Sequence, residues 1–419
     1  MEQVNGGPAT AVATRSVSLF ERIALSVLGR IDRGFLHITL PDGSKITAGD
    51  RSSSMRGSMR IVREDFFRKG VLFADIGFGE SYVDGDWETE DLTGLLRLLL
   101  ANIDALTFFS GSRGYFAPVN LFKFANRIVH TMRGNSLLQS RRNVRDHYDL
   151  PAEFFALFLD RTMTYSSARF SDADMSLEEA QAEKYDRLCR AMKLRSGDRV
   201  LELGCGWGGF AEHAAREYGC AVTGLTISRE QFAFVQKRLE REKLAAQVEV
   251  RLEDYREVQG EYDKIVSIEM LEAVGHRYLR TFFRKCHELL VDDGVLGLEV
   301  IVCPDSRYDQ LRKGVDWIQK HIFPGSLIPS IKAINDAVAA TGDLYLHDLD
   351  EFGMDYARTL GLWRRALNEK LDRLRALGFD EQFIRKWNYY LSYCEVGFEL
   401  RNLNVVQMIY ARPNNLRFR

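Results

Sequence analysis

The feature that most limits the fold is VLELGCGWGG at residues 200–209, an apolar run that ends in alternating glycines. Gly204, Gly206 and Gly208 allow the backbone to turn tightly and to approach a ligand without a Cβ in the way. The next segment, FAEHAAREYG, has a helical pattern. The sequence therefore predicts a strand, a glycine turn and a helix, the unit that opens a Rossmann-like sheet.

An acidic residue in this turn argues against a dehydrogenase. Glu202 precedes the glycines and gives the pattern E-x-G-x-G-x-G. In dehydrogenases the acid instead follows the second strand, and that place here carries Thr226, Ser228 and Gln231, with Glu230 as the only carboxylate nearby. The pattern resembles the first motif of class I methyltransferases, which implies S-adenosylmethionine (AdoMet) as the cofactor. The alternative is an ordinary tight turn in some other α/β fold.

The periodicity downstream agrees with a buried parallel sheet. Short Leu-rich or β-branched runs alternate with helical patterns or turns, as βαβ units require; the runs are RVLELG, AVTGLT, QVEVRL, DKIVSI and VLGLEV. A polar and helical insertion covers residues 305–340. Beyond it we expect a long helix from Trp363 to Leu374, a second helix and a final strand. The predicted fold class is α/β, a Rossmann-like class I methyltransferase sheet with a helical insertion or lid, behind a small α+β domain.

The chain divides into four parts by composition. Residues 1–15 are predicted to be a disordered tail, 16–110 an accessory lipid-docking domain, 111–145 a helical connector and 146–419 the methyltransferase domain. In the accessory domain we expect a helix over Leu19–Leu28, short strands at FLHITL and SKITAG, and a turn-rich stretch from Gly77 that runs into a helix.

Composition excludes several classes of protein. The net charge of −2 points to no nucleic-acid partner, and the six cysteines form no CxxC pair, so we expect no metal and a reduced, cytoplasmic protein. No apolar run reaches the roughly 18–20 residues that span a bilayer, and the N-terminus lacks the layout of a signal peptide. Any contact with a membrane is therefore expected to be peripheral.

Further segments resemble the cyclopropane-fatty-acid synthase family, which includes the mycolic acid methyltransferases. They are HYDLPAEFFALFLDRTMTYSSARF (147–170), LTISREQ (225–231), EMLEAVGHRYLRTFF (269–283), HIFPGSLIPS (321–330) and FGMDYARTL (352–360). GFGESYVDGDWE near the N-terminus looks like the phospholipid-modifying branch, so the resemblance covers roughly residues 60–410. It implies transfer of the AdoMet methyl group to a double bond in a lipid acyl chain. The resulting carbocation loses a proton to a base and gives a cyclopropane or a branched olefin.

The resemblance also assigns the cofactor site. It implies that Tyr165 and Ser166 contact the methionine part of AdoMet and that the glycine turn, through Gly204 and Gly206, contacts the cofactor backbone. Thr226 and Gln231 are assigned to the ribose. Asp254 and Tyr255 are assigned to the adenine. We include Gly208 with the turn. Taken singly, Asp254 could equally be a solvated turn residue.

The base site departs from the family pattern. Most members hold a bicarbonate ion with a Cys, a Glu, a His and a Tyr, and only Glu272 and Tyr356 match. Ser167 stands at the Cys position, where its backbone N–H remains available, and Glu299 stands at the His position. A second carboxylate disfavours bicarbonate, so we expect Glu272 and Glu299 to form a coupled pair, one of which is the base. The alternative is that Glu299 points elsewhere, because the alignment of this strand can shift by a residue or two.

A carbocation must be shielded from water, and aromatic faces can stabilise it. The candidates are Tyr148, Phe154, Tyr165, Phe170, Tyr356 and Trp363. For each of them the alternative is plain core packing, and we expect it for about half.

The expected substrate is an unsaturated phospholipid at the inner face of the cell membrane. The connector could supply a basic amphipathic contact through Arg127, Arg133, Arg141, Arg142 and Arg145, although a solvated linker explains the same residues. A homodimer is left open. Two other functions remain: a methyltransferase for another small or lipid-like olefinic substrate, and a lipid-binding relative that has lost catalysis.

Overall fold

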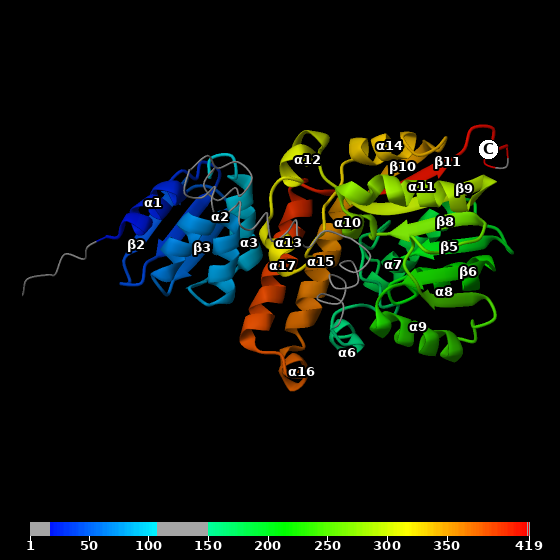
Figure 1. Ribbon diagram of the computed structural model, residues 1–419. Coiled ribbons are helices and arrows are strands. Elements are labelled where there is room, and N and C mark those ends of the chain that lie inside the picture. The colour runs from blue at the N-terminus through cyan, green and yellow to red at the C-terminus, as the bar shows by residue number, and fades with distance from the viewer. Residues whose placement is uncertain (1–16, 107–149, 417, 419) are drawn as a thin grey trace, which may run out of the picture.

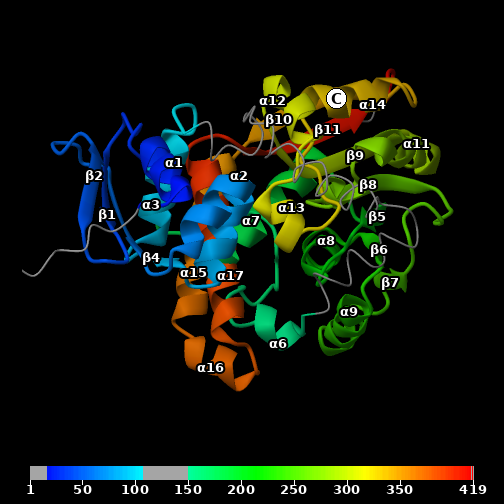
Figure 2. The same cartoon turned by 60° about the vertical axis from the view of Figure 1, so that its left-hand side comes forward.

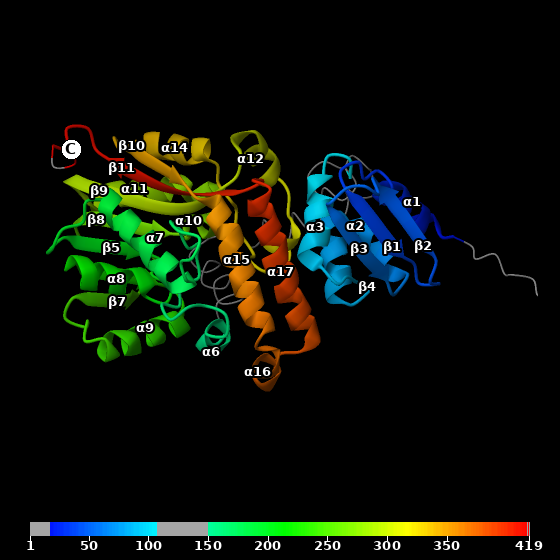
Figure 3. The same cartoon turned by 180° about the vertical axis from the view of Figure 1, so that it is seen from behind.

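The computed structural model describes residues 17–106, 150–416 and 418. The predicted tail at 1–15 and connector at 111–145 lie outside these residues. A small sheet occupies one end of the molecule and a larger sheet the other, and the long helices α15 (Gly353–Asn368) and α17 (Glu381–Glu399) stand between them (Figures 1 and 3).

The first part of the described chain is an α+β unit. Its elements are α1 (Leu19–Leu28), β1 (Phe35–Thr39), β2 (Lys45–Gly49), β3 (Arg56–Ile61), α2 (Asp65–Val83), β4 (Trp87–Glu88) and α3 (Leu92–Ala101). The strands lie in the order β2-β1-β3-β4, with β1 antiparallel to β2 and parallel to β3. The expected helix over Leu19–Leu28 and the strands in FLHITL and SKITAG are confirmed.

The expected turn-rich stretch starts later than Gly77, because α2 continues to Val83, and the helix that it runs into is α3. The glycines here serve close packing. A Cβ on Gly79 would lie 2.5 Å from Trp317 Cδ1 and 2.8 Å from Tyr389 Cε1. Helix α2 is kinked instead at Ala74, whose φ is +51°. The turn begins at Asp84, after α2 has ended. Within α2, Gly79 packs against Trp317 and Tyr389.

The second part of the described chain contains a larger sheet in the order β10-β11-β9-β8-β5-β6-β7. Its strands are β5 (Arg199–Leu203), β6 (Ala221–Thr226), β7 (Val248–Leu252), β8 (Tyr262–Ile268), β9 (Leu290–Val302), β10 (Tyr345–Glu351) and β11 (Asn404–Ala411). Strands β5 to β9 are parallel to one another, and β11 is antiparallel to both β9 and β10. The five predicted strand runs are confirmed, whereas β10 has no predicted counterpart.

Helices cover both faces of this sheet. One face packs on α7 (Leu177–Ala191), α8 (Gly209–Tyr218) and α9 (Arg229–Arg241), and the other on α11 (Leu279–Leu289) and α14 (Ile331–Ala339). Each helix presents an apolar stripe; in α11 it comprises Leu279, Phe282, Cys286 and Leu289, all of them buried. The central strands of the sheet are therefore buried on both faces, as their near-continuous apolar runs require, whereas the edge strands β10 and β7 are partly exposed.

The remaining helices of the described chain are short. They are α6 (Ala152–Phe155), α10 (Leu271–Val274), α12 (Asp305–Leu311), α13 (Trp317–His321) and α16 (Leu371–Ala376), with a 3₁₀ turn at His276–Tyr278. The long helix expected from Trp363 to Leu374 is instead two helices, because α15 ends at Asn368 and α16 begins at Leu371.

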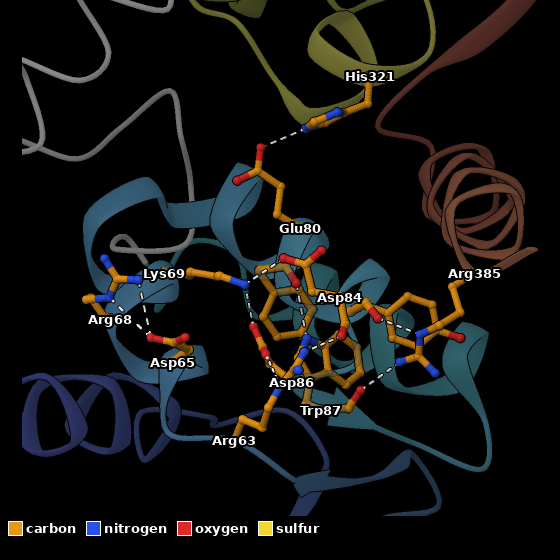
Figure 4. Close-up of polar contacts among 12 residues, drawn as sticks. Arg63, Asp65, Arg68, Lys69, Glu80, Asp84, Asp86, Trp87, His321 and Arg385 are labelled. Atoms are coloured by element: carbon orange, nitrogen blue, oxygen red, sulfur yellow. Dashed lines mark hydrogen bonds and ion pairs between the residues drawn. The ribbon is translucent and has the colours of Figure 1, made fainter. Parts of the chain in front are cut away.

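The two parts meet where α2 and α3 contact α17 and α13 (Figure 2). Glu80 of α2 accepts hydrogen bonds from Lys320 Nζ at 2.7 Å and pairs with His321 Nε2 at 2.8 Å. From the other side, Arg385 of α17 donates to the carbonyl oxygens of Tyr82 at 2.6 Å and Trp87 at 2.9 Å (Figure 4). The contact joins polar and apolar groups of both parts.

Candidate active site

A cavity opens at the carboxyl ends of the parallel strands β5, β6 and β8, the edge at which open α/β sheets bind ligands. One side of its wall is polar and comes from the glycine turn and the ends of β6 and β7. The other side is mostly apolar and includes Ile318, Phe323, Ile328, Leu360, Phe398 and Leu403. The cavity can therefore hold a polar cofactor next to an apolar chain.

The glycine turn forms part of the polar wall. Gly204 has φ +83°, and a Cβ there would lie 2.7 Å from Met270 Cγ. Gly206 has φ +51°, and a Cβ there would meet nothing within 4 Å and would occupy the open cavity. Gly208 differs from the prediction, because it does not line the cavity; it begins α8 with φ +83° beside Val235.

The polar wall also contains the residues expected near the ribose and the methionine part. Ser228 begins α9 and accepts a hydrogen bond from the Gln231 backbone, and Thr226 Oγ1 donates to Gln231 Oε1 at 2.8 Å. Tyr165 and Ser166 also line the cavity. The Tyr165 hydroxyl is 2.9 Å from that of Tyr390 on α17. The structure thus brings these predicted residues to one cavity.

Asp254 and Tyr255 follow β7 and also line the cavity. Both oxygens of Asp254 accept hydrogen bonds from the Arg256 guanidinium, at 2.8 and 2.7 Å. Asp254 is buried, so the interpretation as a solvated turn residue is wrong. Its carboxylate is fixed in place and retains acceptor capacity, because each oxygen carries two lone pairs.

Glu202 fits a cationic cofactor. It lines the cavity beneath the turn, is almost fully buried, and its Oε2 has no hydrogen-bond partner. Burial raises the pKa of Glu202 to about 8, although Lys184, a hydrogen bond from the Ala211 backbone and Arg238 act to lower it. A buried carboxyl oxygen without a hydrogen-bond partner attracts a positively charged ligand. The sulfonium and ammonium groups of AdoMet meet this requirement, and the open space at Gly206 admits the cofactor.

Glu269 is a carboxylate of the cavity that the sequence analysis did not assign. It follows β8 directly and lines the cavity. Its Oε1 accepts from the Ser167 backbone N–H at 2.7 Å, and its Oε2 accepts from the Tyr356 hydroxyl at 2.9 Å. Burial and the charges of Glu299 and Glu272 raise its pKa. The predicted donors Ser167 and Tyr356 therefore converge, but on a protein carboxylate.

Glu299 does not line the cavity, which corrects its predicted place as a base beside Glu272, although its charge is among the causes that raise the pKa of Glu272. Glu299 is buried in β9. Its Oε1 lies 3.3 Å from Lys184 Nζ, and its Oε2 accepts from Gln407 Nε2 at 3.0 Å. Lys184 also donates to Ser166 Oγ at 2.6 Å. Burial raises the pKa of Glu299 while Lys184 opposes the shift, so Glu299 balances a buried lysine beneath the cavity wall.

Glu272 is in the cavity as predicted. Its Oε1 accepts from the Ile301 backbone N–H at 2.5 Å, and its Oε2 has no partner. Burial raises the pKa of Glu272 to about 7, and hydrogen bonds from the backbone N–H groups of Glu272 and Ile301 limit the rise. Glu269 and Glu272 therefore both line the cavity, and Glu269 is the one bonded to Tyr356.

The described aromatic candidates differ in whether they line the cavity. Tyr165 and Tyr356 line the cavity, whereas Phe154 and Trp363 are fully buried in the core beside it. Phe170 stacks under the Arg358 guanidinium at 3.8 Å. Tyr148 lies outside the described residues. About half of the described candidates are thus packing residues, as expected, while the lining residues Tyr390 and Phe398 of α17 were missed.

Comparison with known proteins identifies the family. The model of the mycolic acid cyclopropane synthetase family matches residues 135–408. The chain belongs to this family. It is 37% identical to the tuberculostearic acid methyltransferase of Mycobacterium tuberculosis over 90% of this chain and 88% of that protein. It is 34% identical to the cyclopropane-fatty-acyl-phospholipid synthase of Escherichia coli, over 87% and 91%.

Solved structures agree with this family. A cyclopropane synthase from Mycobacterium tuberculosis superimposes with a TM-score of 0.61 at 34% identity, over 65% of this chain and 98% of that one. A mycolic acid cyclopropane synthase solved with SAH and CTAB gives a TM-score of 0.60 at 33% identity, over 64% and 97%. The chain is an AdoMet-dependent methyltransferase with the class I fold, and its family acts on unsaturated acyl chains.

When bound, AdoMet would supply a methyl group on a sulfonium, and the residues of the chain would bind and shield the reactants. Glu202, the glycine turn and Gln231 form the cofactor side of the cavity. The apolar residues of α13, α15 and α17 enclose the other side, where they keep water from a carbocation. Tyr356 and Ser167 hold the Glu269 carboxylate at this wall.

Proposed function

We propose that the substrate is an unsaturated phospholipid and that the enzyme takes it from a membrane surface. The first part of the chain carries this proposal. The Escherichia coli phospholipid synthase matches 87% of the chain, whereas a cyclopropane mycolic acid synthase of Mycobacterium tuberculosis matches only 66% of it while using 99% of its own length. The extra part of this chain therefore corresponds to a part of the phospholipid enzyme.

Membrane contact is expected at the surface only. Among the described residues, none of the helices combines the length and apolar character that a membrane span requires. The arginine-rich connector remains our candidate for docking at the inner face of the membrane, because clustered arginines attract anionic lipids. A partner that is a second copy of the chain stays open.

Two experiments test the substrate. The first is expression in a host with unsaturated lipids, followed by gas chromatography–mass spectrometry of the fatty acids. A new fatty acid one CH₂ heavier than its precursor is expected. The second is incubation of the purified enzyme with AdoMet and phospholipid vesicles, with a soluble olefin as the competing substrate. Methylation of the soluble olefin alone would contradict the proposal, and no methylation despite AdoMet binding would favour a lipid-binding relative without catalysis.

The product is tested with a labelled substrate, since the two full-length relatives are named for different products. The acyl chain is deuterated at the carbons that flank the double bond. Retention of the label shows that the base takes its proton from the transferred methyl group. Loss of one deuterium shows that it takes the proton from a flanking carbon and leaves a branched olefin.

Docking is tested by charge reversal in the connector. Replacing Arg141, Arg142 and Arg145 with Glu should weaken co-sedimentation with anionic liposomes, and high salt should weaken that of the unaltered enzyme by screening. The matched control reverses three exposed charges in and just after α9, at Lys237, Arg241 and Lys243. Equal effects of both triple changes would contradict docking through the connector.

A further inference from the structure

Glu269 has a backbone conformation that few residues with a Cβ adopt. Its φ is +43°, in the left-handed region, at the point where β8 has ended and α10 is about to begin. Glycine holds such a conformation without strain, whereas other residues are disfavoured there. A strained non-glycine residue in a cavity wall indicates that its side chain is needed.

The side chain of Glu269 is held at both oxygens. The Ser167 backbone N–H and the Tyr356 hydroxyl come from segments 102 and 87 residues away along the chain, and each donates to a different oxygen of the carboxylate. Tyr356 is buried in α15. Two donors fixed by separate elements leave the carboxylate little freedom, which is the preorganisation that a proton acceptor needs.

Glu269 also stands between the two halves of the cavity. The next residue, Met270, packs under Gly204 of the cofactor turn. On the other side, Tyr356 and Leu360 of α15 begin the apolar wall. A group in this place faces both a bound AdoMet and the acyl chain that accepts its methyl group.

The surroundings of Glu269 make it a better proton acceptor than an ordinary carboxylate. Burial is the largest cause of its raised pKa, and the negative charges of Glu299 and Glu272 add to it, while Lys184 opposes the rise. A carboxylate with a raised pKa holds a proton more strongly once it has taken one. A base must be ionised beforehand, and the positive charge of a bound AdoMet beside the cavity wall would favour the ionised form.

We propose that Glu269 is the catalytic base of this enzyme and removes the proton after methyl transfer. The inference rests on the proposed function, since methyl transfer to a carbon–carbon double bond leaves a cation that must lose a proton. The π electrons of the acyl chain form a bond to the methyl carbon, the carbon–sulfur bond breaks, and S-adenosylhomocysteine is released. Glu269 then takes a proton from one of two places. If it comes from the transferred methyl group, the electrons of that C–H bond close a cyclopropane onto the cationic carbon; if it comes from a chain carbon next to the cation, they form a new double bond. The protonated carboxyl returns its proton to water after the product leaves.

The same geometry makes a separate small oxyanion unnecessary. The Ser167 and Tyr356 donors, which the family resemblance assigns to bicarbonate, are already bonded to Glu269. A bicarbonate ion would also meet the charges of Glu269 and Glu272. The enzyme should therefore work without bicarbonate.

The test compares the unaltered enzyme with Glu269→Gln in buffer freed of carbon dioxide, with unsaturated phospholipid vesicles and AdoMet. The unaltered enzyme should keep its rate, and Glu269→Gln should lose about 10²–10⁴-fold, the usual effect of a positioned base. Thermal unfolding and AdoMet affinity by calorimetry show whether the variant is folded. Strong dependence of the unaltered enzyme on bicarbonate, or a Glu269→Gln rate within threefold of it, overturns the inference.

A second variant supplies chemical rescue. Glu269→Gly suits the left-handed backbone and frees both donors, so formate or bicarbonate at millimolar concentration should restore part of its activity. Glu272→Ala is the matched control, since there the donors remain bonded to Glu269 and neither ion should help. Equal rescue of both variants, or rescue of Glu272→Ala alone, overturns the inference. If the unaltered enzyme methylates no lipid at all, the proposed function fails instead.

Discussion

AdoMet binding should release a proton from Glu202. With a pKa of about 8, the buried carboxyl is protonated in about nine of ten free molecules at pH 7. A cationic ligand beside its unpartnered Oε2 favours the ionised form. Each binding event at pH 7 should then release about 0.9 proton from this residue, falling to about 0.5 at pH 8 and about 0.1 at pH 9. Affinity should rise with pH until about pH 8 and then level off.

Calorimetry in two buffers measures this release. Phosphate and Tris differ widely in their ionisation enthalpy, so the difference in observed heat gives the number of protons. Glu202→Gln is the control, because the amide does not titrate while its shape is retained. It should remove the contribution of this residue and weaken AdoMet binding about 10- to 150-fold, the effect of one hydrogen bond to a charged group. If the unaltered enzyme and Glu202→Gln release the same number of protons when they bind AdoMet, Glu202 is not the residue that loses the proton.

Three further results are expected. Gly206→Val should abolish AdoMet binding measured by calorimetry with the fold intact, because its side chain fills the open space at the turn; unchanged affinity contradicts this. Glu299→Gln should lower the free energy of unfolding in denaturant by about 3–5 kcal/mol, because it leaves Lys184 buried without a counter-charge. Adding Lys184→Met to this variant should recover part of the lost stability. If the stability losses of the two single variants simply add in the double variant, the pairing is contradicted. The unliganded enzyme should lose stability as pH rises from the ordinary glutamate pKa towards about 8, since folded Glu202 binds its proton more tightly than the unfolded chain does, and Glu202→Gln should flatten this dependence in thermal unfolding across pH 5 to 9.

The cofactor side of the site could be predicted because its signals are local. The glycine turn and the start of α9 are each encoded within a few neighbouring residues, and those residues also form the cavity wall. Gly208 shows the limit of this reasoning. Its spacing matches that of Gly204 and Gly206, yet the turn directs it against Val235 rather than into the cavity.

The base side could not be predicted in the same way, because three-dimensional contacts determine it. Glu269 and Glu272 both stand in the quoted segment EMLEAVGHRYLRTFF, and nothing in that segment shows that the Glu269 side chain lines the cavity from a left-handed backbone position. Its place after a parallel strand was the available signal, since ligands bind at the carboxyl ends of such strands. Glu299 was misplaced because the sequence does not reveal Lys184 of α7 and Gln407 of β11 as its partners.

The contact between α17 and the first part of the chain has a consequence for how the protein unfolds. Buried apolar residues of α2 and α3, such as Phe78 and Leu95, belong to one continuous core with Trp363 of α15 and Tyr389 of α17. At its edge, Thr93 Oγ1 donates to Ser392 Oγ in a buried hydrogen bond at 3.1 Å. A boundary drawn along the sequence therefore cuts through a single cooperative unit. We expect one calorimetric transition for the whole chain, and aggregation of a truncated enzyme that begins after the connector.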